Sequence, residues 1–422
     1  MNVRAPLACL LALAAAALPA EAKRKVKGIQ PFPGPIQPDA GTAAAASRNG
    51  KVVAFAASFR DGGGGRYDAA ETPTVFAWNR RTGLLQQVTA SGPSDQPSAA
   101  DATAYTEVGT SETKEHRERT LVAFRSSANL VGRNADLSPE IFLWDSSNSG
   151  ITQVTEAAAG ASSSPAVGVH FGLEKDDNGL RTGTVKARTR VAFLSTSDLT
   201  GDNPVGLPQV FLYDSGADAV ARIVQLSHST AGAAGPPAVD GEGQRVAFVH
   251  DGDLLPGPDA PGTPAVYHWR REVGLRRATD ETGACEGAAD PALDARGKVV
   301  AWSSTDGPGG PRRILVAGVR GGGLLEVAPS AGDHRAPVLG RGPRPLVFLS
   351  TDPGDGSAPV AERPVTADRG GGFRDLELSG SGVFGAMSLQ NDRRLLFLTT
   401  TADLDGRNAA GRDVIYLVPL RR

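Results

Sequence analysis

The side chains that could carry chemistry in this sequence are few and widely spaced. Its six histidines occur singly, so none has the paired spacing of a metal-binding motif. The HExxH, GxSxG and phosphate-loop signatures are absent from the sequence. Cys285 lies in a TGACEGAAD turn without a recognisable base partner, so we interpret it as a bystander and predict no catalytic residue. The histidines are His116, His170, His228, His250, His268 and His334.

Two acidic stretches resemble calcium-binding loops. These stretches are DLTGDNPVG at 198–206 and DLDGRNAAGRD at 403–413. Calcium loops present carboxylates on alternate residues with a glycine for the turn. In the second loop the predicted ligands are Asp403, Asp405 and Asp413. Asp and Asn also shape turns by bonding their own backbone, and this loop lacks the terminal glutamate of an EF-hand. Both interpretations stay open, and no cofactor other than calcium is predicted.

The first residues have the design of a secretory signal peptide. Arg4 supplies a positive charge, residues 7–18 are apolar, and Ala-Glu-Ala at 20–22 offers a cleavage pattern. A membrane anchor is the alternative, but a spanning helix needs about 20 apolar residues and this run is shorter. We therefore predict a signal peptide over 1–22 and a periplasmic or secreted protein without a transmembrane anchor.

The composition limits the possible partners. The 44 Lys and Arg residues nearly balance 46 Asp and Glu residues, for a net charge of −2. Nucleic-acid binding needs clustered positive charge, so we predict no nucleic-acid partner. Once the signal peptide is removed, Cys285 is the one cysteine that remains. An internal disulfide is then impossible, and the core of a chain of this length must supply the stability.

A repeated hydrophobic unit occupies the rest of the sequence. A first run of the VAF type ends at an aromatic residue and occurs seven times. A second run, such as TVFAW or QVFLY, follows a polar loop, and four of these runs have a proline three residues before their first aromatic. A third run follows a turn, and a fourth run of small residues and proline precedes each VAF. The aromatic residues that end the first runs are Phe55, Phe124, Phe193, Phe248, Trp302, Phe348 and Phe397.

Four short runs rich in β-branched and aromatic residues predict a four-stranded antiparallel sheet in each unit. One such sheet cannot bury both of its faces, but seven packed around an axis can, so we predict an all-β, seven-bladed β-propeller. The small-residue run belongs innermost, where the sheets converge. The last unit lacks its fourth run, and we expect residues 25–30 to supply that strand and close the ring. A ring of six or eight blades and a linear solenoid are the alternatives.

The unit, with its VAF run and its IF/VF-W-D run, resembles the WD40-like (PD40) repeats of TolB-type propellers from exported bacterial proteins. The resemblance covers about residues 25–422 and implies a single propeller domain over 23–422 with a bias toward binding. The SPDG turn of the family stands here as SRNGK at 47–51, DGEGQ at 240–244 and DARGK at 294–298. The separate N-terminal domain of TolB is absent, so the resemblance implies the scaffold and not a role in the Tol system.

The second and third units each carry an insertion between the small-residue run and the VAF run. These insertions should form two long hairpins that lie side by side on one face of the disc. We interpret them as a raised surface for docking a partner; the alternative is two ordinary solvated hairpins. The predicted contact residues are Glu112, Lys114, His116, Arg117, Phe171, Glu174, Lys175 and Asp176.

These patterns favour an exported, non-enzymatic and monomeric propeller that binds a protein or a cell-envelope component. The alternative is a propeller enzyme of the carbohydrate lyase or hydrolase type, with a site at the axis assembled from several blades. A purely structural or calcium-stabilised module is a third interpretation.

Overall fold

The computed structural model describes a defined part of the chain. At 30–31, 95–107, 114–119, 171–175, 181–186, 286, 322–323 and 373–374 only the backbone is described. The described residues are 30–31, 44–47, 50–57, 73–89, 93–107, 114–175, 181–255, 262–278, 286–305, 310–319, 322–327, 332–342, 345–352, 360–367, 373–376, 378, 382–389, 395–404 and 414–420.

The described strands form seven four-stranded antiparallel sheets, here called blades 1 to 7. Blade 1 contains β2 (Ala44–Ala46), β3 (Val52–Ala57), β4 (Thr74–Asn79) and β5 (Leu84–Gln87). Blade 2 contains β6 (Ser94–Glu107), β7 (Lys114–Ser126), β8 (Glu140–Asp145) and β9 (Gly150–Gln153). Blade 3 contains β10 (Ser162–Lys175), β11 (Arg181–Ser195), β12 (Gln209–Asp214) and β13 (Ile223–Gln225).

The remaining four blades follow the same order from the inner to the outer strand. Blade 4 contains β14 (Ala238–Val239), β15 (Arg245–His250), β16 (Ala265–Arg270) and β17 (Gly274–Arg277). Blade 5 contains β18 (Glu286–Leu293), β19 (Val299–Thr305), β20 (Arg312–Gly318) and β21 (Gly322–Glu326). Blade 6 contains β22 (His334–Leu339), β23 (Leu346–Ser350), β24 (Arg363–Ala367) and β25 (Phe373–Asp375). Blade 7 contains β26 (Phe384–Leu389), β27 (Leu395–Thr400), β28 (Val414–Pro419) and β1 (Gln30–Pro31).

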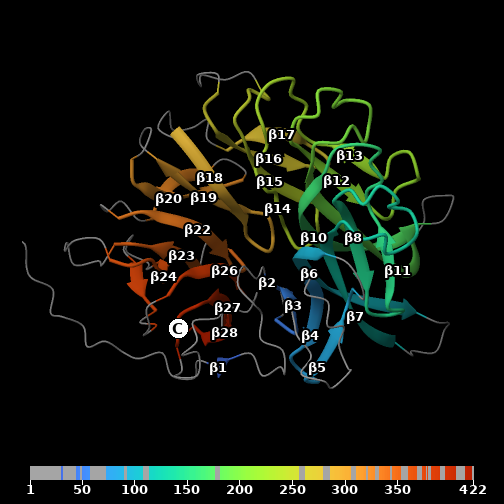
Figure 1. The fold of residues 1–422 in the computed structure, drawn as a ribbon, viewed down its shortest axis with the longest axis horizontal. Helices are drawn as coiled ribbons and strands as arrows, with labels where there is room; N and C mark the ends of the chain where they lie inside the picture. Colours follow the sequence, from blue (N-terminus) through green and yellow to red (C-terminus); the bar gives the residue numbers. More distant parts are fainter. Residues whose placement is uncertain are drawn as a thin grey trace, which may run out of the picture.

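The blades are arranged in a ring, which confirms the predicted seven-bladed propeller. Figure 1 shows the inner strands β2, β6, β10, β14, β18, β22 and β26 around a common axis. The outer strands lie at the periphery. Small residues dominate the inner strands because seven sheets converge there and large side chains would overlap.

The ring closes where the two ends of the described chain meet. Gln30 pairs with Leu417, and Pro31 pairs with Tyr416, so β1 becomes the outer strand of blade 7. Residues 25–29 of the predicted closing segment lie outside the described residues. An outer strand tolerates Pro31 because its free side needs no ladder donor. Blades 1 and 7 are therefore joined by main-chain pairing.

The core consists of aromatic rings packed between neighbouring blades. Phe193 of β11 and Phe211 of β12 stack with their ring centroids 5.8 Å apart, and both are fully buried. They pack against the preceding blade, where Ala123 leaves room for the two rings. Equivalent stacked pairs join the second and third strands of blades 1, 2 and 4. In the VAF run the aromatic therefore faces the preceding blade, and the alanine faces the next.

In blade 7 the register predicted from the VAF-type pattern is wrong by one residue. Leu398, not Phe397, lies opposite Tyr416 in the β27–β28 pairing. Phe397 points to the other side of the sheet and packs with Phe55 and Val53 of blade 1. A shift of one residue moves every side chain of a strand to its other face. Phe397 therefore contributes its aromatic ring to the contact between the last blade and the first.

Candidate functional site

The inner hairpins of blades 2 and 3 extend far beyond their sheets. The third strand β8 pairs with residues 121–126 of β7 only, while β6 and β7 stay paired out to Glu107 and Lys114. In blade 3, β10 and β11 likewise stay paired out to Lys175 and Arg181. About seven residue pairs project in each case, which is roughly 20 Å at 3.3 Å per residue.

The two extensions lie side by side. Strand β10 contacts both β6 and β7, and β11 contacts β6. This arrangement agrees with the expectation for insertions in neighbouring blades. We call the extensions, residues 101–107 and 114–120 of blade 2 with 169–175 and 181–189 of blade 3, the ribbon lobe.

Six of the eight predicted contact residues lie on the ribbon lobe. His116 pairs with Tyr105 across the β6–β7 ribbon, and Phe171 pairs with Ala187 across the β10–β11 ribbon. Their role in binding a partner stays a prediction. Those on β7 are Lys114, His116 and Arg117, those on β10 are Phe171, Glu174 and Lys175, and Glu112 and Asp176 lie outside the described residues.

The base of the blade-3 ribbon is fixed against a turn of blade 4 by close backbone contact. A Cβ atom on Gly168 would overlap the backbone nitrogen of Gly243 and would lie 2.7 Å from the carbonyl oxygen of Asp240. The next residue, Val169, donates its N–H to the carbonyl of Gly241 at 2.8 Å. Only glycine therefore allows the ribbon to pass this close to the turn.

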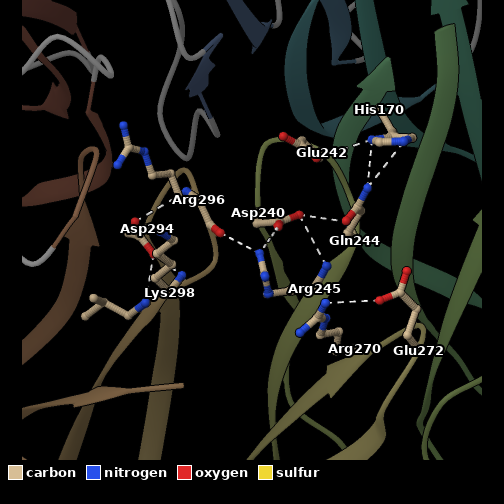
Figure 2. A network of polar contacts seen from close by, with 11 residues as sticks. His170, Asp240, Glu242, Gln244, Arg245, Arg270, Glu272, Asp294, Arg296 and Lys298 are labelled. Carbon is tan, nitrogen blue, oxygen red and sulfur yellow. Dashed lines mark hydrogen bonds and ion pairs between the residues drawn. The ribbon is translucent and has the colours of Figure 1, made fainter. Parts of the chain in front are cut away.

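His170 adds a side-chain contact at the same place. Its Nδ1 lies 3.2 Å from Oε2 of Glu242 and 2.7 Å from Nε2 of Gln244, as Figure 2 shows. Three consecutive residues of the ribbon thus hold one turn of the next blade. We call residues 168–170, with the turn 240–244, the ribbon clamp.

The turn in the clamp owes its shape to a buried carboxylate. Asp240 is almost fully buried, and its Oδ1 accepts the N–H groups of Gln244 at 2.8 Å and Arg245 at 3.2 Å. Asp294 has the same role in blade 5, where its Oδ1 accepts the N–H of Val299 at 2.8 Å. The turns 240–244 and 294–298 therefore both have a side-chain oxygen at their first position.

The turns of successive blades are also joined to one another. Gly241 donates its N–H to the carbonyl oxygen of Ala295 at 3.1 Å. Ala295 donates its own N–H to the carbonyl oxygen of Gly340 at 3.0 Å. Nη1 of Arg245 donates to the carbonyl of Arg296 at 2.6 Å, as Figure 2 shows. Together with the bond from Val169, these contacts connect blades 3 to 6 on the face that carries the ribbon lobe.

A buried ion pair lies beneath the clamp. Nε of Arg190 donates to Oδ2 of Asp214 at 3.0 Å, and Arg271 of blade 4 bonds to the same oxygen. Burial by itself raises the pKa of Asp214, but the N–H of Gly216 and the two guanidinium groups outweigh it and hold the pKa below its usual value. Gly243 passes over Arg190, since a Cβ there would lie 2.6 Å from the Cβ of the arginine.

Three of the described histidines are buried, and they lie on three different strands, β15, β16 and β22. Nδ1 of His250 accepts the N–H of Gly252 at 2.8 Å, a position that a serine such as Ser195 occupies in other blades. His268 on β16 and His334 on β22 are also buried. Burial lowers the pKa of all three, that of His268 to about 4.

The loop at 198–206 is closed by its own side chains. Oδ1 of Asp198 accepts the N–H of Asn203 at 2.9 Å, and Nδ2 of Asn203 donates to the carbonyl of Leu207 at 2.9 Å. Asn129 and Asn134 repeat this arrangement in blade 2. The shared pattern of Asp or Asn, then Leu-x-Gly-x-Asn, marks the arrangement in the sequence. In the loop at 198–206 the side chains therefore bond their own backbone, as the turn-shaping interpretation predicted.

The calcium interpretation of 403–413 stays a prediction. Asp403 is described, whereas Asp405 and Asp413 lie outside the described residues, as does Cys285. Over the described ranges, no group of three or more His, Cys, Asp or Glu residues could hold a metal ion. Nor does that part of the chain contain a helix both long and apolar enough to cross a membrane.

Comparison with known proteins supports the architecture. No protein-family model and no curated protein matches this sequence. The structure is similar to oligogalacturonate lyase from Vibrio parahaemolyticus, with a TM-score of 0.51 and 12% identity over 93% of this chain and 94% of that chain. It is also similar to the β-propeller domain of the Trilobed protease from Pyrococcus furiosus, with a TM-score of 0.51 and 9% identity over 90% and 94%.

TolB from Acinetobacter baumannii is a more distant neighbour, with a TM-score of 0.39 and 12% identity over 88% of this chain and 80% of that chain. At such low identity these likenesses concern the fold alone. The class that the fold defines is a seven-bladed β-propeller of four-stranded blades. Within this chain, blades 2 and 3 differ from the other blades in having extended inner hairpins.

Proposed function

We propose that this protein is an exported, non-enzymatic β-propeller that binds a protein or a cell-envelope component through its ribbon lobe. The observation that carries the proposal is the contact between two projecting ribbons, one of which is fixed to the next blade by the ribbon clamp. Export is supported by the signal-peptide pattern at 1–22.

The ribbon clamp favours binding because it restricts the conformational freedom of the blade-3 ribbon before a partner associates. An isolated two-stranded hairpin is at best marginally stable in water. Here the blade-3 ribbon lies against the blade-2 ribbon and is fixed at its base by the contacts of Gly168, Val169 and His170. A surface ordered before association loses less entropy when it binds, so the ordering favours affinity.

The proposal is tested by shortening both ribbons above the clamp. The variant removes residues 104–117 and 172–186, each replaced by a two-residue Asn-Gly turn, and keeps residues 168–170. The wild-type chain, cross-linked to cell-envelope extract of the producing cell, should capture a defined set of proteins that the shortened variant loses. A control with Val220→Ser and Val224→Ser, two exposed positions on the outer edge of blade 3, should capture the same set as wild type. Equal capture by the shortened variant would reject the ribbon lobe as the docking surface.

Export is tested separately by sequencing the N-terminus of the protein recovered from periplasm and medium. A mature chain that begins at residue 23 is expected. Recovery of a chain that still carries residues 1–22, in the cytoplasmic fraction only, would contradict export.

The propeller enzyme remains the alternative. A carbohydrate lyase or hydrolase would need acid, base or metal-binding groups gathered from several blades, and the likeness to a lyase shows the fold alone. No observation on the described residues favours this alternative over binding.

A further inference from the structure

The turns next to the ribbon lobe have their acidic and basic side chains on opposite sides. Asp240 and Asp294 are buried and accept N–H groups of their own turns. Arg296, Lys298 and Arg341, in the turns of blades 5 and 6, are exposed. The negative charges are thus directed inward and the positive charges outward.

These three cations, which we call the cationic rim, have fixed positions relative to the ribbon lobe. The N–H of Ala295, the residue before Arg296, bonds to Gly340, the residue before Arg341. Ala295 in turn accepts the N–H of Gly241, which belongs to the ribbon clamp. The rim and the lobe therefore lie on one face and are joined by continuous main-chain contacts.

Within the described part of these turns, one acidic side chain is exposed. This is Glu242, whose carboxylate lies 3.2 Å from His170 in the ribbon clamp, as Figure 2 shows. Its charge faces the ribbon. The turns of blades 5 and 6 consequently present positive charge, although the whole chain has a net charge of −2.

We infer that the partner that docks at the ribbon lobe is a protein with an acidic segment, which lies on the cationic rim. The inference rests on the proposed function and adds the chemistry of the partner. Complementary charge guides association and fixes the orientation of the partner, and arginine forms bidentate bonds with carboxylates. Because the rim is solvent-exposed, its contribution should weaken as salt is added.

The test uses a fluorescent 20-residue peptide of alternating Glu and Ser as the probe, at low ionic strength. The rim variant Arg296→Glu with Lys298→Glu reverses two charges. It leaves the main-chain bonds of the turn in place, because Asp294 accepts from the backbone N–H groups of residues 298 and 299. The matched control, Arg80→Glu with Arg81→Glu, makes the same change of charge in an exposed turn of blade 1.

The rim variant should bind the peptide about tenfold more weakly than wild type, because each exposed ion pair contributes modestly and two are reversed. The control should bind within about twofold of wild type, and salt at 0.5 M should remove the difference. Equal loss in both variants would show a response to net charge alone and would overturn the inference. Tighter binding to phosphatidylglycerol vesicles than to the peptide would overturn it in favour of a membrane surface.

The ribbon-shortened variant separates this inference from the proposed function. It retains the rim, so it should still bind the peptide even if it loses the envelope partner. Loss of peptide binding in that variant, with the rim variant unaffected, would place the acidic site on the ribbons and contradict the inference. Thermal unfolding of each variant establishes that it is folded.

Discussion

At the scale of single residues, positions 168–170 give the clearest link from sequence to proposed function. A glycine permits the close approach, a backbone N–H forms the bond, and a histidine contacts two side chains of the opposing turn. Each contact is small, but together they fix the direction in which one ribbon leaves the disc.

The tight contact at Gly168 predicts the effect of a single added methyl group. In Gly168→Ala the new Cβ meets backbone atoms of the blade-4 turn, which cannot move aside as a flexible side chain would. We expect a loss of about 1–3 kcal/mol in the free energy of unfolding. Hydrogen exchange at Val169, whose N–H bonds to Gly241, should also become faster. The control is Gly235→Ala, where the nearest atom would lie at 3.7 Å and near-normal stability is expected. Unchanged exchange at Val169 would contradict the account of the clamp.

The burial of His268 predicts a pH dependence of stability. Burial and nearby arginines lower its pKa to about 4 from 6.5, so the unfolded chain binds this proton more readily than the folded chain. The stabilisation is present above pH 6.5 and is lost as the pH falls from 6.5 toward 4, by about 3 kcal/mol at most. Denaturant unfolding of His268→Gln should therefore show a smaller decrease over this range than wild type. The exposed His228→Gln should follow wild type, and an identical pH profile for all three proteins would contradict the prediction.

At the scale of the strand, the alternation of VAF residues explains how the blades pack. The aromatic and the alanine lie on opposite faces of the second strand, so each blade offers large rings to one neighbour and small residues to the other. The prolines that precede the third strands also help to connect one blade to the next. The carbonyl of Pro139 accepts the N–H of Ser162, which begins the next blade, and proline has no N–H that would be left unpaired.

The stacked pair in blade 3 provides a test of this packing. Phe193→Ala would empty a fully buried site between blades 2 and 3, and should cost about 3–5 kcal/mol of unfolding free energy. Val220→Ala, at a side chain that is 95% exposed, should cost almost nothing. Equal stability of the two variants in denaturant titration would show that the aromatic layer is not the core.

The fold was predictable because the pattern that defines a blade is local and repeated. The strands, the inner position of the small residues and the closure by the N-terminal segment all followed from short runs of sequence. The register at Phe397 was not predictable in this way, because it depends on which residue of β28 lies opposite. The ribbon clamp was missed for a similar reason, since His170 and Glu242 are separated by 72 residues and neither is unusual within its own segment.

At the scale of the whole molecule, hydrogen bonds between neighbouring blades hold the ring together. Pairing of β1 with β28 joins the first and last blades, and the backbone bonds between turns join blades 3 to 6. The ribbons rise from this frame on the face that also carries the cationic rim. The propeller is thus a closed frame, and the proposed binding surface is an addition to one side of it.

The most direct measurement of the central claim is photo-cross-linking at chosen positions on the disc. A benzophenone amino acid at His116, on the ribbon lobe, should cross-link the envelope partner in the producing cell. The same group at Val220, an exposed residue on the outer edge of blade 3, should not. Cross-linking of that partner at position 220 and none at position 116 would contradict docking at the ribbon lobe.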